Sequence, residues 1–206
     1  MIVRKTIPTL SAVALDSSTL SNGTDTVIGR VKVTVGAGGA LDWGQMVFTI
    51  NKADGVLLGA TTTDIKLYEG ATQITGTFAT TSSPVGSGYE AFLAATTNGK
   101  LYFRPTAIRT VPENSSATYE LRANVSGIGT GDNISVSIAN PATAVTTGSF
   151  TTVGGTFGSD TSSFVWSDLS VNTHVPGTTG GSEADWTDDY LVQTLPLTIG
   201  NKSVSF

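Results

Sequence analysis

The densest group of side chains that could do chemistry lies near the C-terminal end of the sequence. It contains one histidine and five carboxylates, at Asp168, His174, Glu183, Asp185, Asp188 and Asp189. Asp185 and Asp189 have a spacing that would let them share a Ca²⁺ ion, which takes six to eight oxygen ligands and is often bound by loops. The segment has no EF-hand pattern, and we predict no metal and no cofactor.

A catalytic triad is the second chemistry that this group could support, because His174 lies near Ser167, Ser170 and Asp185 in the sequence. A triad is recognised by its geometry, and an oxyanion hole usually accompanies it. The sequence has no G-x-S-x-G motif, and serine is so common that one beside the single histidine is expected by chance. Among 16 acidic residues a pair for glycoside hydrolysis can always be found. We therefore predict that the protein is not an enzyme.

A structural role for the same group is the interpretation that we favour. Buried aspartates commonly accept hydrogen bonds from loop backbone or from indole N–H groups. Asp168 and Asp185 are suited to this role, because each lies within two residues of a tryptophan. The interpretation predicts that the two indoles are buried in a single cluster, which comprises Trp166, Trp186 and either Tyr190 or Leu195.

The elements that position these residues are predicted to be short β-strands. Runs rich in Val, Ile, Thr, Tyr and Phe alternate apolar and polar residues with a period of two, between clusters of Gly, Asn, Asp and Ser. The predicted strands are 27–35, 45–51, 65–69, 73–79, 100–105, 117–125, 134–138, 163–167, 190–195 and 202–206. Residues 70–72 read as the turn of a hairpin, and one helical turn is expected at 182–188 with Ser182 as its cap. About ten to twelve strands with Gly-rich turns predict an all-β, antiparallel sandwich with long Thr-, Gly- and Ser-rich loops.

Composition excludes several classes of protein. A net charge of −5 and a mean hydropathy of +0.11 argue against a disordered chain. Eleven basic residues and a pI near 4.7 argue against a nucleic-acid partner. No apolar run approaches the roughly 18 residues that a membrane span requires. The absence of cysteine excludes disulfides, thiolate nucleophiles and cysteine-based zinc sites.

Several stretches of the sequence form a pattern that is most specific near its end. They are RKTIPT at 4–9, LSNGTDTVIGRVKVTV at 20–35, FRPTAIRTVPENSSATYELRANVSG at 103–127, FVWSDLS at 164–170 and ADWTDDYLVQTLP at 184–196. The pattern resembles a secreted Ig-like module of surface proteins in small-genome, mostly uncultivated bacteria. In that family Asn-Gly often stands where this chain has Asp188-Asp189.

The resemblance implies an Ig-like sandwich in an extracellular, cell-surface or appendage protein. It implies no catalytic residues. Its structural signature falls on six positions of this chain, namely Trp166, Asp168, His174, Asp185, Trp186 and Tyr190.

Asparagine sequons are a further candidate for surface chemistry, because N-x-S/T is the acceptor pattern for N-glycosylation. The sequons are at Asn22, Asn114, Asn124, Asn133 and Asn201. Asn124 and Asn133 are predicted to lie on exposed strand faces, whereas polar turns and strand faces explain the same residues without any glycan.

The function that we favour from the sequence is a structural subunit of an extracellular filament or pilus. Its partners would be copies of itself, joined head-to-tail by strand addition, in which an extended peptide pairs with the sheet edge of a neighbour. Residues 1–10 are the predicted donor segment, with Val3 and Ile7 on one face, and residues 11–206 are the single sandwich domain. A C-terminal strand with Val204 and Phe206 is the rival donor, and an ordinary first or last strand is the alternative for both ends.

A surface binding module is the second class of function. It would be an adhesin or a carbohydrate-binding sandwich with a ligand on a host surface or in a matrix, and a viral coat protein ranks below it. Carbohydrate modules present several aromatic rings as stacking platforms, whereas aromatic residues make up only 8% of this chain. Two of its three tryptophans belong to the structural signature, which favours assembly over sugar recognition.

Overall fold

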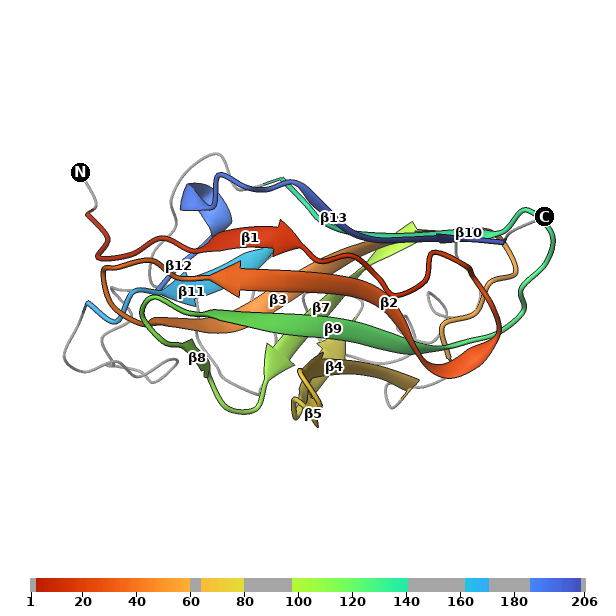
Figure 1. The fold of residues 1–206 in the computed structure, drawn as a ribbon, viewed down its shortest axis with the longest axis horizontal. Coiled ribbons are helices and arrows are strands. Elements are labelled where there is room, and N and C mark those ends of the chain that lie inside the picture. The colour runs from red at the N-terminus through yellow and green to blue at the C-terminus, as the bar shows by residue number, and fades with distance from the viewer. Residues whose placement is uncertain (1–2, 60–63, 80–97, 141–161, 171–185, 205–206) are drawn as a thin grey trace.

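The structure is a computed structural model that describes residues 3–59, 64–79, 98–140, 162–170 and 186–204. Thirteen strands and one 3₁₀ turn form within these residues. The strands make two antiparallel sheets that pack against each other, so the predicted all-β sandwich is confirmed (Figure 1). In this part of the chain no helix is both long and apolar enough to cross a membrane.

The first sheet has five strands in the order β1-β2-β9-β4-β5. Their bounds are Thr9–Ala12 for β1, Gly23–Thr34 for β2, Ser116–Val125 for β9, Ile65–Glu69 for β4 and Thr72–Gln73 for β5. The long pair β2 and β9 forms its centre, with Val31 opposite Tyr119. Along β9, Tyr119, Leu121, Ala123 and Val125 are buried, as the period of two predicts.

The second sheet is built around the long strand β3. β3 spans Leu41–Lys52, β6 Gly76–Ala79, β7 Asn98–Pro105, β8 Arg109–Val111, β10 Asn133–Ile138, β11 Phe164–Ser167, β12 Trp186–Thr187 and β13 Leu197–Ser203. One edge of β3 pairs with β11 and β10, and the other pairs with β8 and β7. β12, β13 and β6 extend the sheet from β11, β10 and β7.

A single main cluster of buried side chains fills the space between the sheets and draws on residues from Leu10 to Ile199. Aromatic rings form its centre. The Trp43 ring lies edge-on to Tyr119 with centroids 5.1 Å apart, and it also contacts Phe103 and Phe164. The Trp43 Nε1–H donates to the Tyr119 hydroxyl at 3.0 Å, so this buried pair satisfies its polar atoms internally.

Several predicted elements differ from the observed ones. The strand predicted at 202–206 is β13, which begins at Leu197 and ends at Ser203, and residues 186–187 of the predicted helical turn form β12 instead. In β2 the register shifts between Val27 and Gly29, so the extra residue turns Ile28 rather than Val27 into the core. The predicted strand 73–79 is split, because the chain leaves the first sheet after β5 and enters the second sheet at β6. The predicted strand 190–195 is instead a 3₁₀ turn, Asp189–Leu191, followed by turns. The Asp188 carboxylate caps that turn by accepting the Tyr190 N–H.

The two sheets approach closely at Gly200 of β13. A Cβ at this position would lie 1.9 Å from the Ile28 carbonyl oxygen of β2. Gly200→Ala is therefore expected to lower the free energy of unfolding by about 1–3 kcal/mol, because one sheet must shift. Gly36→Ala is the matched control, since a Cβ there meets nothing within 4 Å. Equal urea midpoints for the two variants would contradict the expectation.

Burial raises the pKa of Tyr119 to about 12. Because this folded-state pKa lies above the unfolded value near 10, the neutral hydroxyl stabilises the fold fully below pH 10. That contribution is lost as the pH rises from 10 to 12, by about 2–3 kcal/mol. Denaturation from pH 9 to 12 should show this loss, and Tyr119→Phe should have a shallower pH dependence. Identical slopes for the two proteins would refute the assignment.

Candidate assembly site

Asp168 is the buried carboxylate that fixes the N-terminal part of the chain. It follows β11 and is 1% exposed. Its Oδ2 accepts the Lys5 backbone N–H at 2.7 Å, and its Oδ1 accepts from Arg4 Nη1 at 3.4 Å. The Arg4 side chain is only 3% exposed, and its guanidinium lies over the Trp166 ring, 5.8 Å from the centroid. Asp168 thus joins the start of the chain to the predicted signature.

Three further contacts complete what we call the N-terminal seat, formed by Gly38, Asp168, Leu169 and Thr194. Lys5 Nζ donates to the Leu169 carbonyl at 3.2 Å, and the Leu10 N–H donates to Thr194 Oγ1 at 3.0 Å. A Cβ on Gly38 would lie 2.0 Å from the Lys5 carbonyl oxygen, so the bound segment runs directly over this glycine. The N-terminal seat therefore recognises the backbone of the segment, its two basic side chains and its close fit over Gly38.

The segment 3–8 has one buried face and one exposed face. Thr6 and Pro8 are buried, whereas Val3 is 75% exposed and Ile7 is 46% exposed. Among the described residues only Tyr190, at 40%, joins them as an exposed large hydrophobic side chain. Val3 and Ile7 are four residues apart, which places them on one face of an extended chain, as the sequence predicts.

The predicted donor segment 1–10 overlaps the sandwich at its last two residues. Thr9 and Leu10 belong to β1, where they pair with Thr34 and Val33 of β2. Leu10 is 1% exposed and packs in the main core. The part that lies outside the sheets is therefore 3–8, because residue 10 is already needed to fill the core.

The rival donor lies within its own sandwich as far as the structure describes it. The Val204 N–H donates to the Asp132 carbonyl at 2.9 Å, and its side chain packs against the main core. Phe206 lies outside the described residues.

The two tryptophans of the predicted signature are both buried, at 0% exposure, but in different clusters. Trp166 belongs to the main core together with Leu195, whereas Trp186 packs with Val165 and Ile108. The single-cluster prediction is wrong, because β12 pairs Trp186 with Ser167 and so places the indole on the other face of β11. Tyr190 is exposed, and His174 and Asp185 lie outside the described residues.

The metal candidate falls only partly within the described residues, because Asp185 is outside them. Asp189 is 1% exposed, and its Oδ2 accepts the Ser163 N–H at 2.6 Å. Asp189 therefore joins the loop after β12 to the start of β11. Within the described ranges no three His, Cys, Asp or Glu side chains gather as a metal site.

The five sequon asparagines occupy different environments. Asn22, Asn114, Asn133 and Asn201 are exposed. Asn124 is half-buried, and both ends of its amide are engaged: Nδ2 donates to Asp64 at 2.6 Å, and Oδ1 accepts the Asp25 N–H at 3.0 Å. The expectation of an exposed strand face therefore fits Asn133 and not Asn124.

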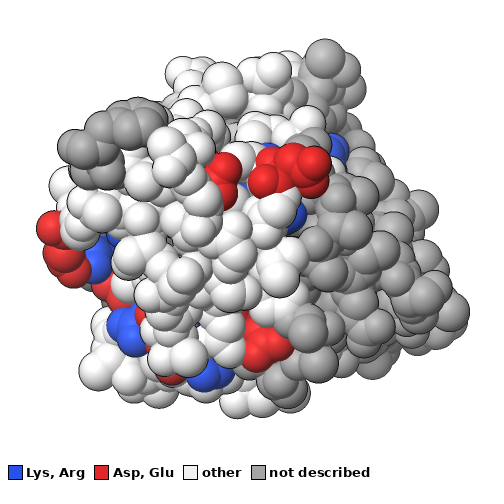
Figure 2. Space-filling view, turned by 90° about the vertical axis from the view of Figure 1, so that its right-hand side faces the viewer, with Lys and Arg blue, Asp and Glu red and all other residues white. Residues whose placement is uncertain are grey.

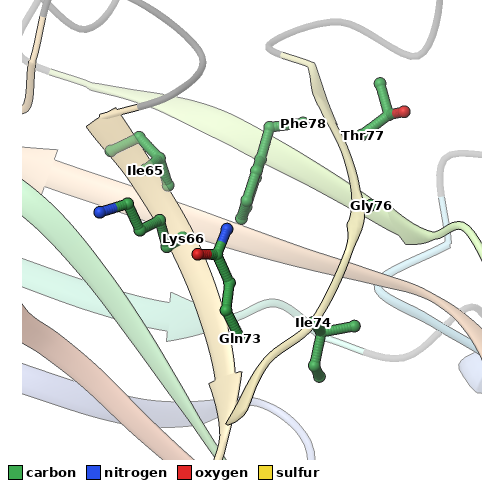
Figure 3. A pocket seen from close by; sticks show the side chains of 7 residues that line it. All are labelled: Ile65, Lys66, Gln73, Ile74, Gly76, Thr77 and Phe78. Carbon is green, nitrogen blue, oxygen red and sulfur yellow. The ribbon is translucent and has the colours of Figure 1, made fainter.

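A groove of about 400 Å³ opens where the two sheets part, between β4 and β6 (Figure 3). Ile65, Ile74 and Phe78 give it apolar walls, and Gln73 points into the space between the strands. β5 pairs with β4 only at Tyr68 and Glu69, so within the described residues no strand covers the outer edge of β4 at Ile65. The groove is a second place where a strand could add to this sandwich.

The end of the molecule opposite the N-terminal segment carries charges of both signs. Figure 2 shows lysine and arginine interspersed with aspartate and glutamate there rather than gathered into a basic face. Lys52 Nζ donates to the Val56 carbonyl, and Lys202 Nζ to the Ser17 carbonyl, each at 2.5 Å. Desolvation lowers the pKa of both lysines. The two ammonium groups therefore bind loop carbonyls at this end of the molecule.

No protein-family model and no curated protein matches the chain. Among solved structures it is similar to the T6 backbone pilin of serotype M6 Streptococcus pyogenes, a modular three-domain protein. The identity is 10% and the TM-score 0.22, over 64% of this chain and 29% of the pilin. The chain thus spans less than a third of that pilin, and a TM-score this low carries no inference about function.

Asp168→Asn is expected to loosen the N-terminal segment. It removes the charge that Arg4 and the Lys5 N–H bind, which should lower the free energy of unfolding by about 1.5–3 kcal/mol. Hydrogen exchange of residues 4–6 should quicken, while exchange in the centre of β9 should stay slow. Asp16→Asn is the control, because that carboxylate is 86% exposed in its pair with Arg30 and contributes little. Unchanged exchange at Lys5 would contradict the assignment.

Proposed function

We propose that this chain is a structural subunit of an extracellular filament or pilus on the cell surface. Copies of it would assemble head-to-tail, each donating its N-terminal segment to the next as an added strand. One observation carries the proposal above all. The segment 3–8 lies outside both sheets and exposes Val3 and Ile7, although its other face is firmly bound.

The physical reason is the cost of apolar surface in water. Each square ångström of apolar surface removed from water contributes about 25 cal/mol, so two exposed aliphatic side chains on one strip favour a contact that covers them. Open strand edges, such as that of β4, supply unpaired backbone groups for such a contact.

The binding-module alternative has less support. All three tryptophans are 0% exposed, so none of them offers a ring on which a sugar could stack. We also propose that the protein has no catalytic role, since the sequence has no G-x-S-x-G motif around the serines near His174.

Electron microscopy of the purified chain tests the proposal. We expect long, uniform filaments, together with a sedimenting fraction that grows with protein concentration. Dispersed monomers at millimolar concentration would overturn the filament proposal. Binding of that monomer to a glycan array or to matrix proteins would then support the binding-module alternative.

A further inference from the structure

The N-terminal seat is a ready-made binding site for one particular peptide. It recognises two successive basic residues through Asp168 and the Leu169 carbonyl, and it recognises the extended backbone through the Lys5 N–H. Five residues after Lys5, Thr194 Oγ1 accepts the Leu10 N–H. Every copy of the chain carries both this site and the sequence that fills it.

We propose that this seat is also the acceptor site in assembly, where it binds the N-terminal segment of a second copy in place of its own. The inference rests on the proposed function and deepens it, because it names the acceptor residues. The exchanged element is residues 3–12, that is, the segment together with β1. Val3 and Ile7 face away from the seat and then lie between the two copies.

The N-terminal seat is favoured as acceptor over the groove between β4 and β6, because an exchange keeps the contacts that the segment already makes. In an exchange every bond that the segment loses within its own chain is regained with the second chain. The remaining costs are the opening of the linker that follows β1 and the translational and rotational freedom that two chains lose when they associate. In the groove, the buried Asp168 would lose both the Arg4 guanidinium and the Lys5 N–H. Removing one partner of a buried ion pair is strongly destabilising where the other stays buried.

The exchanged element lies at one edge of the sandwich, and the place of its core side chain, Leu10, is taken by the Leu10 of the second copy. β1 is a four-residue edge strand that pairs with β2 alone. Residues 13–19 connect it to Leu20, which is 3% exposed and stays fixed by the bond from its N–H to the Ser203 carbonyl. Seven extended residues reach about 23–25 Å, which is enough to carry β1 to an adjacent copy. In this linker, Ala14 and Asp16 bind the Arg30 guanidinium at the surface, and the Val13 N–H donates to the Arg30 carbonyl. The carbonyls of residues 17–19 accept from Lys202 Nζ and the Ser203 N–H, so these bonds must open before the whole linker can extend.

Thiol crosslinking tests the exchange, since the chain has no cysteine of its own. Lys5→Cys marks the segment, and Ser170→Cys marks the seat, because Lys5 Nζ lies 3.2 Å from the carbonyl that precedes Ser170. Thr77→Cys marks the rival groove. A Lys5→Cys chain is mixed with a size-tagged chain that carries either seat or groove cysteine. The mixture is refolded together at high concentration and treated with a short bis-maleimide.

We expect interchain products between Lys5→Cys and Ser170→Cys in the assembled fraction, at least tenfold above those with Thr77→Cys. Filaments with a Thr77→Cys product instead would move the acceptor to the groove and overturn the inference alone. Filaments in which a Lys5→Cys, Ser170→Cys double variant links only within one chain would also overturn it. Closed dimers with the Ser170→Cys product would uphold the exchange and refute the filament. Monomers with intrachain links only would refute both.

Discussion

The double substitution Val3→Asp, Ile7→Asp is expected to abolish assembly while the sandwich stays folded. Both side chains point into water in the single chain, so charge there should change the free energy of unfolding by no more than about 0.5 kcal/mol. In the proposed contact each would bring an unpaired carboxylate into an apolar interface, which is strongly unfavourable. Sedimentation and electron microscopy should show monomers only, with an unchanged melting temperature.

Tyr190→Ser is the matched control for this prediction. Tyr190 is the remaining exposed large hydrophobic side chain among the described residues, and it lies on the 3₁₀ turn rather than on the segment. Filaments should persist in this variant. Assembly that survives in the Asp double variant, or that fails equally in Tyr190→Ser, would show that the segment has no special role.

Trp43→Ala is expected to cause the largest loss of stability. Trp43 is 0% exposed, stacks edge-on against Tyr119 and donates to its hydroxyl. Removing a buried aromatic ring costs about 3–5 kcal/mol, which is a large share of the 5–15 kcal/mol that typically holds a domain together. Urea denaturation followed by tyrosine and tryptophan fluorescence measures the change.

Trp43→Phe separates the two parts of that loss. It keeps an aromatic ring between Phe103 and Phe164 but removes the indole N–H that the Tyr119 hydroxyl accepts. Its loss should be clearly smaller than that of Trp43→Ala. If Trp43→Ala cost less than about 1 kcal/mol, the aromatic cluster would not be the centre of the core.

The alternation of apolar and polar residues predicted the strands wherever one face of a strand is buried and the other is wet. Residues 117–125 and 134–138 are examples, because successive side chains of a strand point alternately to the buried and to the exposed face. The same local rule predicted that Val3 and Ile7 share a face, and both are exposed. The all-β class follows from such strands without any knowledge of their partners.

Which strand pairs with which was decided only by the tertiary structure. Trp166 and Trp186 lie on opposite faces of the second sheet because β12 pairs with β11 at Ser167, a register that no local pattern encodes. The split of 73–79 between the two sheets likewise depends on which strand each half meets.

The contacts of the N-terminal seat were likewise beyond the reach of local sequence patterns, because they join residues that lie far apart in the chain. Asp168 meets the Lys5 N–H across 163 positions of sequence. The sequence by itself determined that Asp168 would need hydrogen-bond donors once buried, because a carboxylate deprived of water must be paired. It did not determine which donors, since that depends on how β1 and β11 are brought together by strands that lie between them in the chain.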